Sequence, residues 1–537
     1  MQCATLGKVQ PTLQQPTARA AYVPVLAAIC LFTLLVLRTA WISDDACITF
    51  RTIENFVGGD GLRWNIDERV QVYTHPLWLF LLTACRLITG ELSLTAITVS
   101  VVLSVVTVLI LAGRLAVAAL PALVGVMALA LSKAFTDFST SGLENALMHL
   151  LLAGFAVVYF AGEPTRRTVF WLSLLTALLV LTRPDALLLV APALVLTAWR
   201  ARAFLPSVLG FIPLIAWELF SLIYYGFLLP NTAYAKLNTG MPHHVLAGRG
   251  MYYIVQTLQH DSLTLIVLAV GLLTPFLVHA RKQMPLALGA CLYIAYVVSV
   301  GGDFMLGRFL TAPLLIAVIL LARQHLATPT ALILLALVMI IGLFPKRSPF
   351  FADENYGSRY DGICLVQDER ACYYQHTGLL TAFHRRQFLD HICVEQGLAA
   401  RRADKPVVRA SIGMFGLHAG RETFIVDELG LGDALLARLT PFPEEDWRIG
   451  HLHRAIPAGY LETLATGRNQ IADTELAAYY DRIALATRAD LFDSRRWKAI
   501  AELNLGLVRP PRKYVLAQAP ANQEARGRGS SRDTSTP

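Results

Sequence analysis

Charged residues are scarce in this chain of 537 residues, because Asp, Glu, Lys and Arg make up only 16% while apolar residues reach 55%. With a mean hydropathy of +0.52, this composition excludes a water-soluble globular protein with an ordinary charged surface. Nucleotide-binding fingerprints are also missing, since "GGDG" and "GLGDA" lack the required glycine spacing and the strand-to-helix setting. The sequence therefore predicts a membrane protein without a nucleotide-binding fold.

No cleavable signal peptide is expected either. Lys8 and Arg19 precede a long apolar stretch, but no short apolar region with a small-residue cleavage site follows them. We expect residues 1–20 to be a cytoplasmic segment and the first helix to be an uncleaved anchor. At the other end, residues 518–537 are of low complexity and are expected to be disordered.

Long apolar runs dominate residues 21–345, which are predicted to form a transmembrane domain. A bilayer-spanning helix needs about 17–25 residues, and by this measure roughly 10–13 helices are expected. From about 346 onward, charges, glycines and prolines return, so residues 346–517 are predicted to form a soluble periplasmic domain. The predicted fold class is thus mainly α, with a polytopic helical membrane domain and a C-terminal mixed α/β domain. Among the predicted spans are 22–40, 94–112, 203–223, 262–280 and 328–344.

Basic residues set the predicted topology. The formal net charge of +8 is attributed to cytoplasmic loops, which are rich in Lys and Arg, so no nucleic-acid partner is expected. The intervening turns, including a large first loop at 41–75, then share the external face. Ionisable groups so close to lipid are costly and usually functional. The candidate site residues that converge there are Asp44, Asp45, His75, Glu144, Arg183, Asp185, Asn231, Lys236, Asp303 and Arg308.

The segment "SDDACITFRTIENFVGG" permits two interpretations. Ser43 suits a helix N-cap, two acids suit the first turn, and Gly58-Gly59 would end the helix, so capping alone can explain the carboxylates. In the second interpretation Asp44 or Asp45 is a general base, whose pKa partial burial raises toward a useful range. Adjacent helical residues diverge by about 100°, so the other Asp would orient it or hold a divalent cation.

The remaining acids and His75 also have two interpretations each. His75, which precedes a proline at the start of an apolar segment, is either an interfacial hydrogen-bonding group or a phosphate contact. Glu144 in "SGLEN" either begins a helix or serves the site. Asp185 in "TRPDA" either pairs with Arg183 or serves the site. All of them are candidates for contacts with a ligand at this face.

The turn "GGDFMLGRF" at 301–309 is more informative. Two glycines bring the backbone close while Asp303 and Arg308 enter the same membrane-edge turn. Arg308 is a candidate ligand for a lipid-linked phosphate, and snorkelling toward water is the alternative. Lys236, after "LPNTAYA", has the same two interpretations. Outside these loops, Cys364 and Cys372 are candidates for a short-loop disulfide in an oxidising compartment.

Eight segments, which occur once each and in this order along the chain, carry a family resemblance: "DDACITFR", "GDGLRWNIDERVQVYTHPLW", "TSGLEN", "TRPDALL", "YYGFLLPNTAYAK", "GGDFMLGRF", "FIVDELGLGDALLAR" and "GHLHRAIPAGY". With this set, the chain resembles the large-loop polytopic glycosyltransferases of the GT-C type. Within them it resembles the mycobacterial terminal arabinofuranosyltransferase family and its Gram-negative relatives. The resemblance covers most of the chain.

The resemblance implies transfer of a sugar, expected to be arabinofuranose, from a polyprenyl-phosphate donor. The acceptor would be a cell-envelope glycan or protein outside the bacterial cytoplasmic (inner) membrane. The catalytic acid of the family's first external loop maps onto Asp44-Asp45, Arg308 is expected to neutralise the departing phosphate, and residues 346–517 are expected to hold the acceptor.

Two other classes fit a polytopic protein with charged loops. The first is a transporter or flippase of a lipid-linked envelope precursor. Carriers tend to hold their charges near the bilayer midplane, often within internal repeats, and the sequence shows neither. The second is an assembly protein whose external domain recruits envelope polymers. Activity that depends on Asp44 or Asp45 would separate an enzyme from both.

Overall fold

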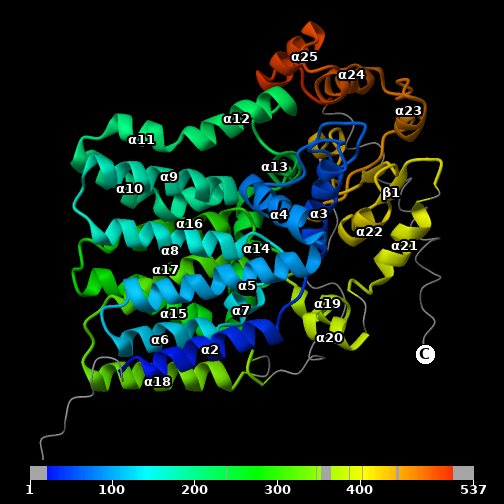
Figure 1. The fold of residues 1–537 in the computed structure, drawn as a ribbon. Helices are drawn as coiled ribbons and strands as arrows, with labels where there is room; N and C mark the ends of the chain where they lie inside the picture. The colour runs from blue at the N-terminus through cyan, green and yellow to red at the C-terminus, as the bar shows by residue number, and fades with distance from the viewer. Residues whose placement is uncertain are drawn as a thin grey trace, which may run out of the picture.

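The computed structural model (Figure 1) describes residues 21–237, 239–345, 348–351, 365–385, 388–401, 403–442 and 447–511. Long helices lie side by side in one bundle, and shorter helices from the first loop and the C-terminal part gather at one end of it. The predicted segments 1–20 and 518–537 and the residue Cys364 lie outside the described residues, so the disulfide between Cys364 and Cys372 stays a prediction.

The bundle helices are rich in Leu, Val, Ile and Ala, and several have a proline as their second residue. Proline suits the first helical turn because it lacks the N–H that would go unpaired there. Their buried side chains form one continuous apolar core. The helices are α2 (Val23–Arg38), α5 (Ser93–Ile110), η1 (Leu111–Leu115), α6 (Ala119–Leu131), α8 (Asn145–Ala161), α9 (Arg166–Thr182), α10 (Leu187–Ala201), α11 (Phe204–Gly210), α12 (Ile212–Tyr224), α15 (Ser262–Leu277), α16 (Met284–Ser299), α17 (Thr311–Ala322) and α18 (Thr328–Leu343).

Small residues allow close packing between these helices. A Cβ on Gly289 of α16 would lie 2.1 Å from the carbonyl oxygen of Leu189 in α10. Any larger residue would therefore force the two backbones apart. Close approach of this kind is typical of helices that associate by van der Waals packing.

Membrane-span candidates are present among the described helices. Two, Ser93–Leu115 and Pro184–Ala201, are long and apolar enough to cross a membrane, and up to four qualify if each bent pair counts as one span. The predicted span 203–223 is one such pair, α11 and α12, bent by 52° where Pro213 opens α12. The other apolar helices have 10–17 residues, so the predicted number is reached only if these also cross.

The end of the bundle carries the elements that build the site. From the N-terminal part come α3 (Asp44–Val57), α4 (Pro76–Thr89) and α7 (Lys133–Asp137), followed by η2 (Pro184–Ala186), α13 (Asn231–Leu237), α14 (His243–His260) and η3 (Arg308–Leu310). The C-terminal part supplies α19 (Glu369–Thr377), α20 (Leu379–Arg385), α21 (Ile392–Ala400), β1 (Val407–Arg409), α22 (Gly413–His418), β2 (Ile425–Asp427), η4 (Leu436–Arg438), α23 (Tyr460–Thr466), α24 (Thr474–Arg488) and α25 (Ser494–Asn504).

The C-terminal part is mostly helical. Within the described residues its only sheet pairs β1 with β2 in parallel, in the register Val407↔Ile425, Val408↔Val426 and Arg409↔Asp427. Strands of three residues add little to the core, so helices and ordered loops make up most of the structure described there.

The first loop and the C-terminal part fold against each other. Trp41, Phe50 and Trp64 of the first loop share one buried apolar cluster with residues such as Met414 and Ile425. The buried Arg51 ties the two parts together, because its Nε donates to the Trp64 carbonyl at 2.8 Å and its Nη2 to that of Thr423 at 2.9 Å. The shared core fixes the N-terminus of α3 next to C-terminal residues.

Candidate active site

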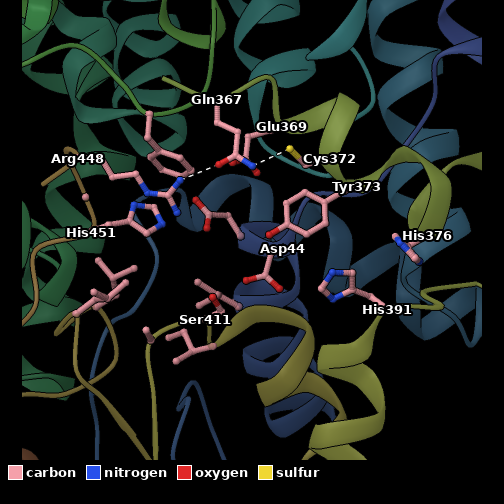
Figure 2. Close-up of a pocket in the computed structure, with 18 of the residues that line it drawn as sticks. Asp44, Gln367, Glu369, Cys372, Tyr373, His376, His391, Ser411, Arg448 and His451 are labelled. Atoms are coloured by element: carbon pink, nitrogen blue, oxygen red, sulfur yellow. Dashed lines mark hydrogen bonds between the residues drawn. The ribbon is translucent and has the colours of Figure 1, made fainter. Parts of the chain in front are cut away.

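Two cavities open beside the N-terminus of α3. One, of about 360 Å³, is lined largely by residues 367–451 and is called the C-terminal cavity (Figure 2). The other, of about 310 Å³, is lined by loops at the ends of bundle helices and is called the bundle cavity. The cavities adjoin, since they share the lining residues Asp45, Ile48, Lys236, Phe304, Leu431 and Gly450.

The predicted helix of the first loop is confirmed. Ser43 caps α3 by accepting the N–H of Ala46 at 3.2 Å, and α3 ends at Gly58. The two aspartates occupy the first helical turn, where negative charge interacts favourably with the helix dipole. The cap therefore fixes the position of both aspartates at the start of α3. The tertiary structure then gives each carboxylate a different environment.

Asp44 contacts the C-terminal part. Its Oδ1 accepts the N–H of Met414 at 2.7 Å and its Oδ2 that of Gly413 at 3.2 Å. A Cβ on Gly413 would lie 1.9 Å from the Asp44 carbonyl oxygen, so only glycine permits this approach. Burial and the neighbouring charge of Asp45 raise the pKa of Asp44 to about 6, against the lowering effect of the two N–H groups.

Asp45 is placed differently. It lines both cavities, and among the described residues its carboxylate has no hydrogen bond or ion pair. The two aspartates therefore diverge as neighbours on a helix must. Asp44 holds α22 against α3, while Asp45 is available to a molecule in either cavity.

Glu144 is the centre of an ionic network beside the bundle cavity. Its Oε1 accepts from Nη2 of Arg308 and from Nη1 of Arg183, both at 3.0 Å. Its Oε2 lies 3.3 Å from Nδ1 of His75. Burial alone would raise the pKa of this carboxyl, but Arg308, His75 and Arg183 outweigh that effect and hold the pKa well below its usual range. Glu144 is thus a fixed anion that orients two arginines.

The outer members of the network are also paired. Arg183 donates from Nη2 to Asp185 at 2.6 Å and from Nε at 3.0 Å, which confirms the predicted pairing of these two residues. His75 bonds through Nε2 to the hydroxyl of Thr49 on α3 at 2.8 Å. These contacts connect the first loop to α9 and leave the bundle cavity lined on one side by guanidinium groups.

Several buried polar atoms of the bundle cavity lack a partner among the described residues. They are Nε of Arg308, Oδ2 of Asp303 and Oγ1 of Thr232. Burial raises the pKa of Asp303, with Arg308 and Lys236 acting against that effect. Unsatisfied buried groups are costly, so a polar ligand in this cavity would relieve their cost.

Lys236 lies where the two cavities meet. It sits in the last turn of α13, lines both cavities, and has no ion pair among the described residues. In contrast, the predicted site residue Asn231, at the start of the same helix, is fully engaged. Its Nδ2 donates to the carbonyls of Gly430, Leu431 and Asp433, and its Oδ1 accepts from Arg438 at 2.9 Å. The role of Asn231 in donor binding stays a prediction.

Most residues of the C-terminal cavity were not predicted from the sequence. Figure 2 shows Gln367, Glu369, Tyr373, Arg448 and His451 around it, together with Asp44. Nη1 of Arg448 donates to Oε1 of Gln367 at 2.7 Å. These residues lie in "QDERACYY" and "WRIGHLH", which have the mixed polarity of any solvated surface. His451 lies in "GHLHRAIPAGY", one of the segments that support the family resemblance, whereas the other residues have no local pattern that indicates a site.

A divalent cation at Asp44 or Asp45 stays a prediction. No group of three or more His, Cys, Asp or Glu side chains suited to a metal occurs among the described residues. Asp44 is already engaged with two backbone N–H groups. No step proposed below depends on a metal.

No family model matches the chain. The chain does have relatives among known proteins. The chain is 28% identical over 520 residues to the terminal beta-(1->2)-arabinofuranosyltransferase of Mycobacterium tuberculosis, covering 78% of this chain and 81% of that enzyme. It is 30% identical over 329 residues to the enzyme of the same name from Corynebacterium glutamicum, covering 51% of this chain and 46% of that enzyme.

Among solved structures, ArnT from Cupriavidus metallidurans bound to undecaprenyl phosphate aligns with a TM-score of 0.43 and 15% identity, over 79% of this chain and 78% of that chain. Similarity at this level carries no conclusion about this protein. The sequence similarity to the mycobacterial enzyme, in contrast, extends over most of both chains. The chain is thus an enzyme of the glycosyltransferase class, similar over most of its length to the terminal arabinofuranosyltransferases.

Proposed function

We propose that the chain is a GT-C type enzyme that transfers arabinofuranose from a polyprenyl-phosphate donor to a hydroxyl of a cell-envelope glycan or protein. The reaction would take place at the periplasmic face of the bacterial cytoplasmic membrane. The observation that carries the proposal is the junction of two cavities at Asp45. A donor in the bundle cavity and an acceptor in the C-terminal cavity would meet at one carboxylate.

The donor phosphate fits the bundle cavity. Arg308 lines this cavity, and its Nε has no partner among the described residues. Lys236 lines the cavity as well and forms no ion pair with a described residue. Glu144 holds Arg308 and Arg183 in place, and oriented cations bind phosphate through strong charge-assisted hydrogen bonds. The bundle cavity is thereby suited to a phosphate that stays bound while the bond to the sugar breaks.

An apolar groove supports a lipid donor. It has a volume of about 600 Å³ and is lined by residues such as Pro76, Phe80, Leu181 and Trp217 from α4, α9 and α12. Trp217 packs against Tyr73, which lines the bundle cavity, with ring centroids 6.2 Å apart. The groove thus leads toward the proposed phosphate site, and a polyprenyl chain can lie in it because its isoprene units are apolar.

In the proposed step, the acceptor hydroxyl oxygen forms a bond to the anomeric carbon of the donor sugar. The bond between that carbon and the phosphate oxygen breaks, and its electron pair leaves with the polyprenyl phosphate. Asp45 takes the proton of the acceptor hydroxyl as a general base. Arg308 and Lys236 stabilise the negative charge on the departing phosphate.

Separate substitution of the two aspartates tests this proposal. Asp45→Asn should lower kcat by about 10²–10⁴-fold without changing the thermal midpoint, whereas Asp44→Asn should retain most of the activity. Asp67→Asn, at an exposed position of the same first loop, is the matched control. Purified protein is given a polyprenyl-phosphate arabinofuranose and a synthetic arabinofuranoside, and products are measured by mass spectrometry. Full activity of Asp45→Asn, or an intact sugar-phosphate bond with wild-type protein, would contradict the proposal.

A further inference from the structure

Glu369 is a carboxyl group at the wall of the C-terminal cavity. It begins α19, it is only 5% exposed, and it lines the C-terminal cavity (Figure 2). Among the described residues no hydrogen bond or ion pair involves its side chain. A carboxyl group that lines a cavity and has no described protein partner is available to hydrogen-bond a molecule in that cavity.

The residues on either side of Glu369 are tied to the bundle. Asp368 accepts from Nζ of Lys133 at 3.1 Å and also caps α19 through the N–H of Ala371. On the other side, Nε of Arg370 donates to Oδ1 of Asp137 at 2.6 Å. Lys133 and Asp137 both belong to α7. Ion pairs on both sides therefore fix the start of α19, and Glu369 is held at the cavity wall.

The surroundings of Glu369 favour its neutral form. Burial raises its pKa well above the usual range, the charge of Asp45 adds to this effect, and Arg448 opposes it. A protonated carboxyl both donates and accepts hydrogen bonds. Sugar hydroxyls also do both. Tyr373 and Phe304 line the same cavity and offer aromatic surface next to these polar groups.

We propose that Glu369 binds the hydroxyl groups of the acceptor sugar and thereby places the reacting hydroxyl at Asp45. The inference rests on the proposed function, because it assigns the C-terminal cavity to the acceptor. Glu369 is then a binding residue from the C-terminal part, whereas the base comes from the first loop. An acceptor bridging the two would be held at the junction of the cavities.

Binding and turnover of three variants test the inference separately from the reaction. The probe is a synthetic octyl arabinofuranoside oligosaccharide, titrated into detergent-purified full-length protein. Glu369→Ala should weaken its binding by about tenfold or more, with the donor KM within about twofold of the wild-type value. Glu369→Gln should stay within about threefold, because an amide also donates and accepts. Glu395→Gln, exposed on α21, is the control, and the thermal midpoint of each variant reports folding.

Each result decides one of the two proposals. Unchanged probe binding by a folded Glu369→Ala protein, or no binding by the wild type, overturns the inference. A loss of kcat without loss of binding in both Glu369 variants also overturns it, since Glu369 would then act as the base. Glu369-dependent binding by a wild-type protein that forms no product keeps the inference and refutes the proposed transfer.

Discussion

Asp44 should make the stability of the protein depend on pH. Its pKa rises from an ordinary value of 3.8 to about 6 in the folded chain. The native state therefore holds the proton more tightly than the unfolded state does. The resulting stabilisation is complete below about pH 4 and is lost as the pH rises through about 6.

At full effect, the pKa shift of Asp44 corresponds to a change of about 3 kcal/mol in the free energy of unfolding. We expect a change of about 1–3 kcal/mol, because Asp44 is only half-buried and solvent screens its charge. Asp44→Asn cannot ionise and should lose this pH dependence, while keeping one bond to the first turn of α22. Asp44→Ala loses both bonds and leaves the N–H groups of Gly413 and Met414 without this acceptor. It should be less stable than Asp44→Asn by about 1–3 kcal/mol.

The assay is the thermal midpoint of detergent-purified protein between pH 4 and 8, for wild type and both variants. The wild-type midpoint should fall between pH 4 and 6 relative to that of Asp44→Asn, and the two curves should run parallel above pH 7. Limited proteolysis should cleave the C-terminal part of Asp44→Ala faster than that of the wild type. Identical pH profiles for wild type and Asp44→Asn would refute the assignment of the shift to this carboxyl.

Two further predictions concern the ionic networks. Asp137→Ala removes the buried carboxylate that accepts from Arg370 at 2.6 Å. It should lower the free energy of unfolding by about 3–5 kcal/mol, which is measured as a lower thermal midpoint. A midpoint equal to that of Asp67→Ala would contradict this. Arg308→Gln removes a cation that contacts Glu144 and lines the bundle cavity. It should raise the donor KM by about 10–100-fold in initial-rate experiments. Acceptor binding, measured by titration, should stay unchanged. An unaltered donor KM would exclude Arg308 from phosphate binding.

Local sequence patterns were sufficient to predict apolar helices that suit membrane spans and the helix of the first loop. Low charge and long apolar runs indicated a membrane protein, since such a surface is unfavourable in water. Ser43 and Gly58 predicted the ends of α3, because caps depend on a few adjacent residues. The same loops also predicted which ionisable residues would gather, and His75, Glu144 and Arg308 do meet in the structure.

Only the tertiary structure decided what each gathered residue contacts. Asp44 and Asp45 are equivalent in the sequence, and they differ because Gly413 and Met414, some 370 residues away, donate to one of them alone. Glu369 is an ordinary glutamate in its local sequence, and it becomes a buried cavity residue because Lys133 and Asp137 anchor its neighbours. Local patterns report helix ends and polarity, whereas the partner of a side chain depends on long-range packing, which no short stretch of sequence encodes.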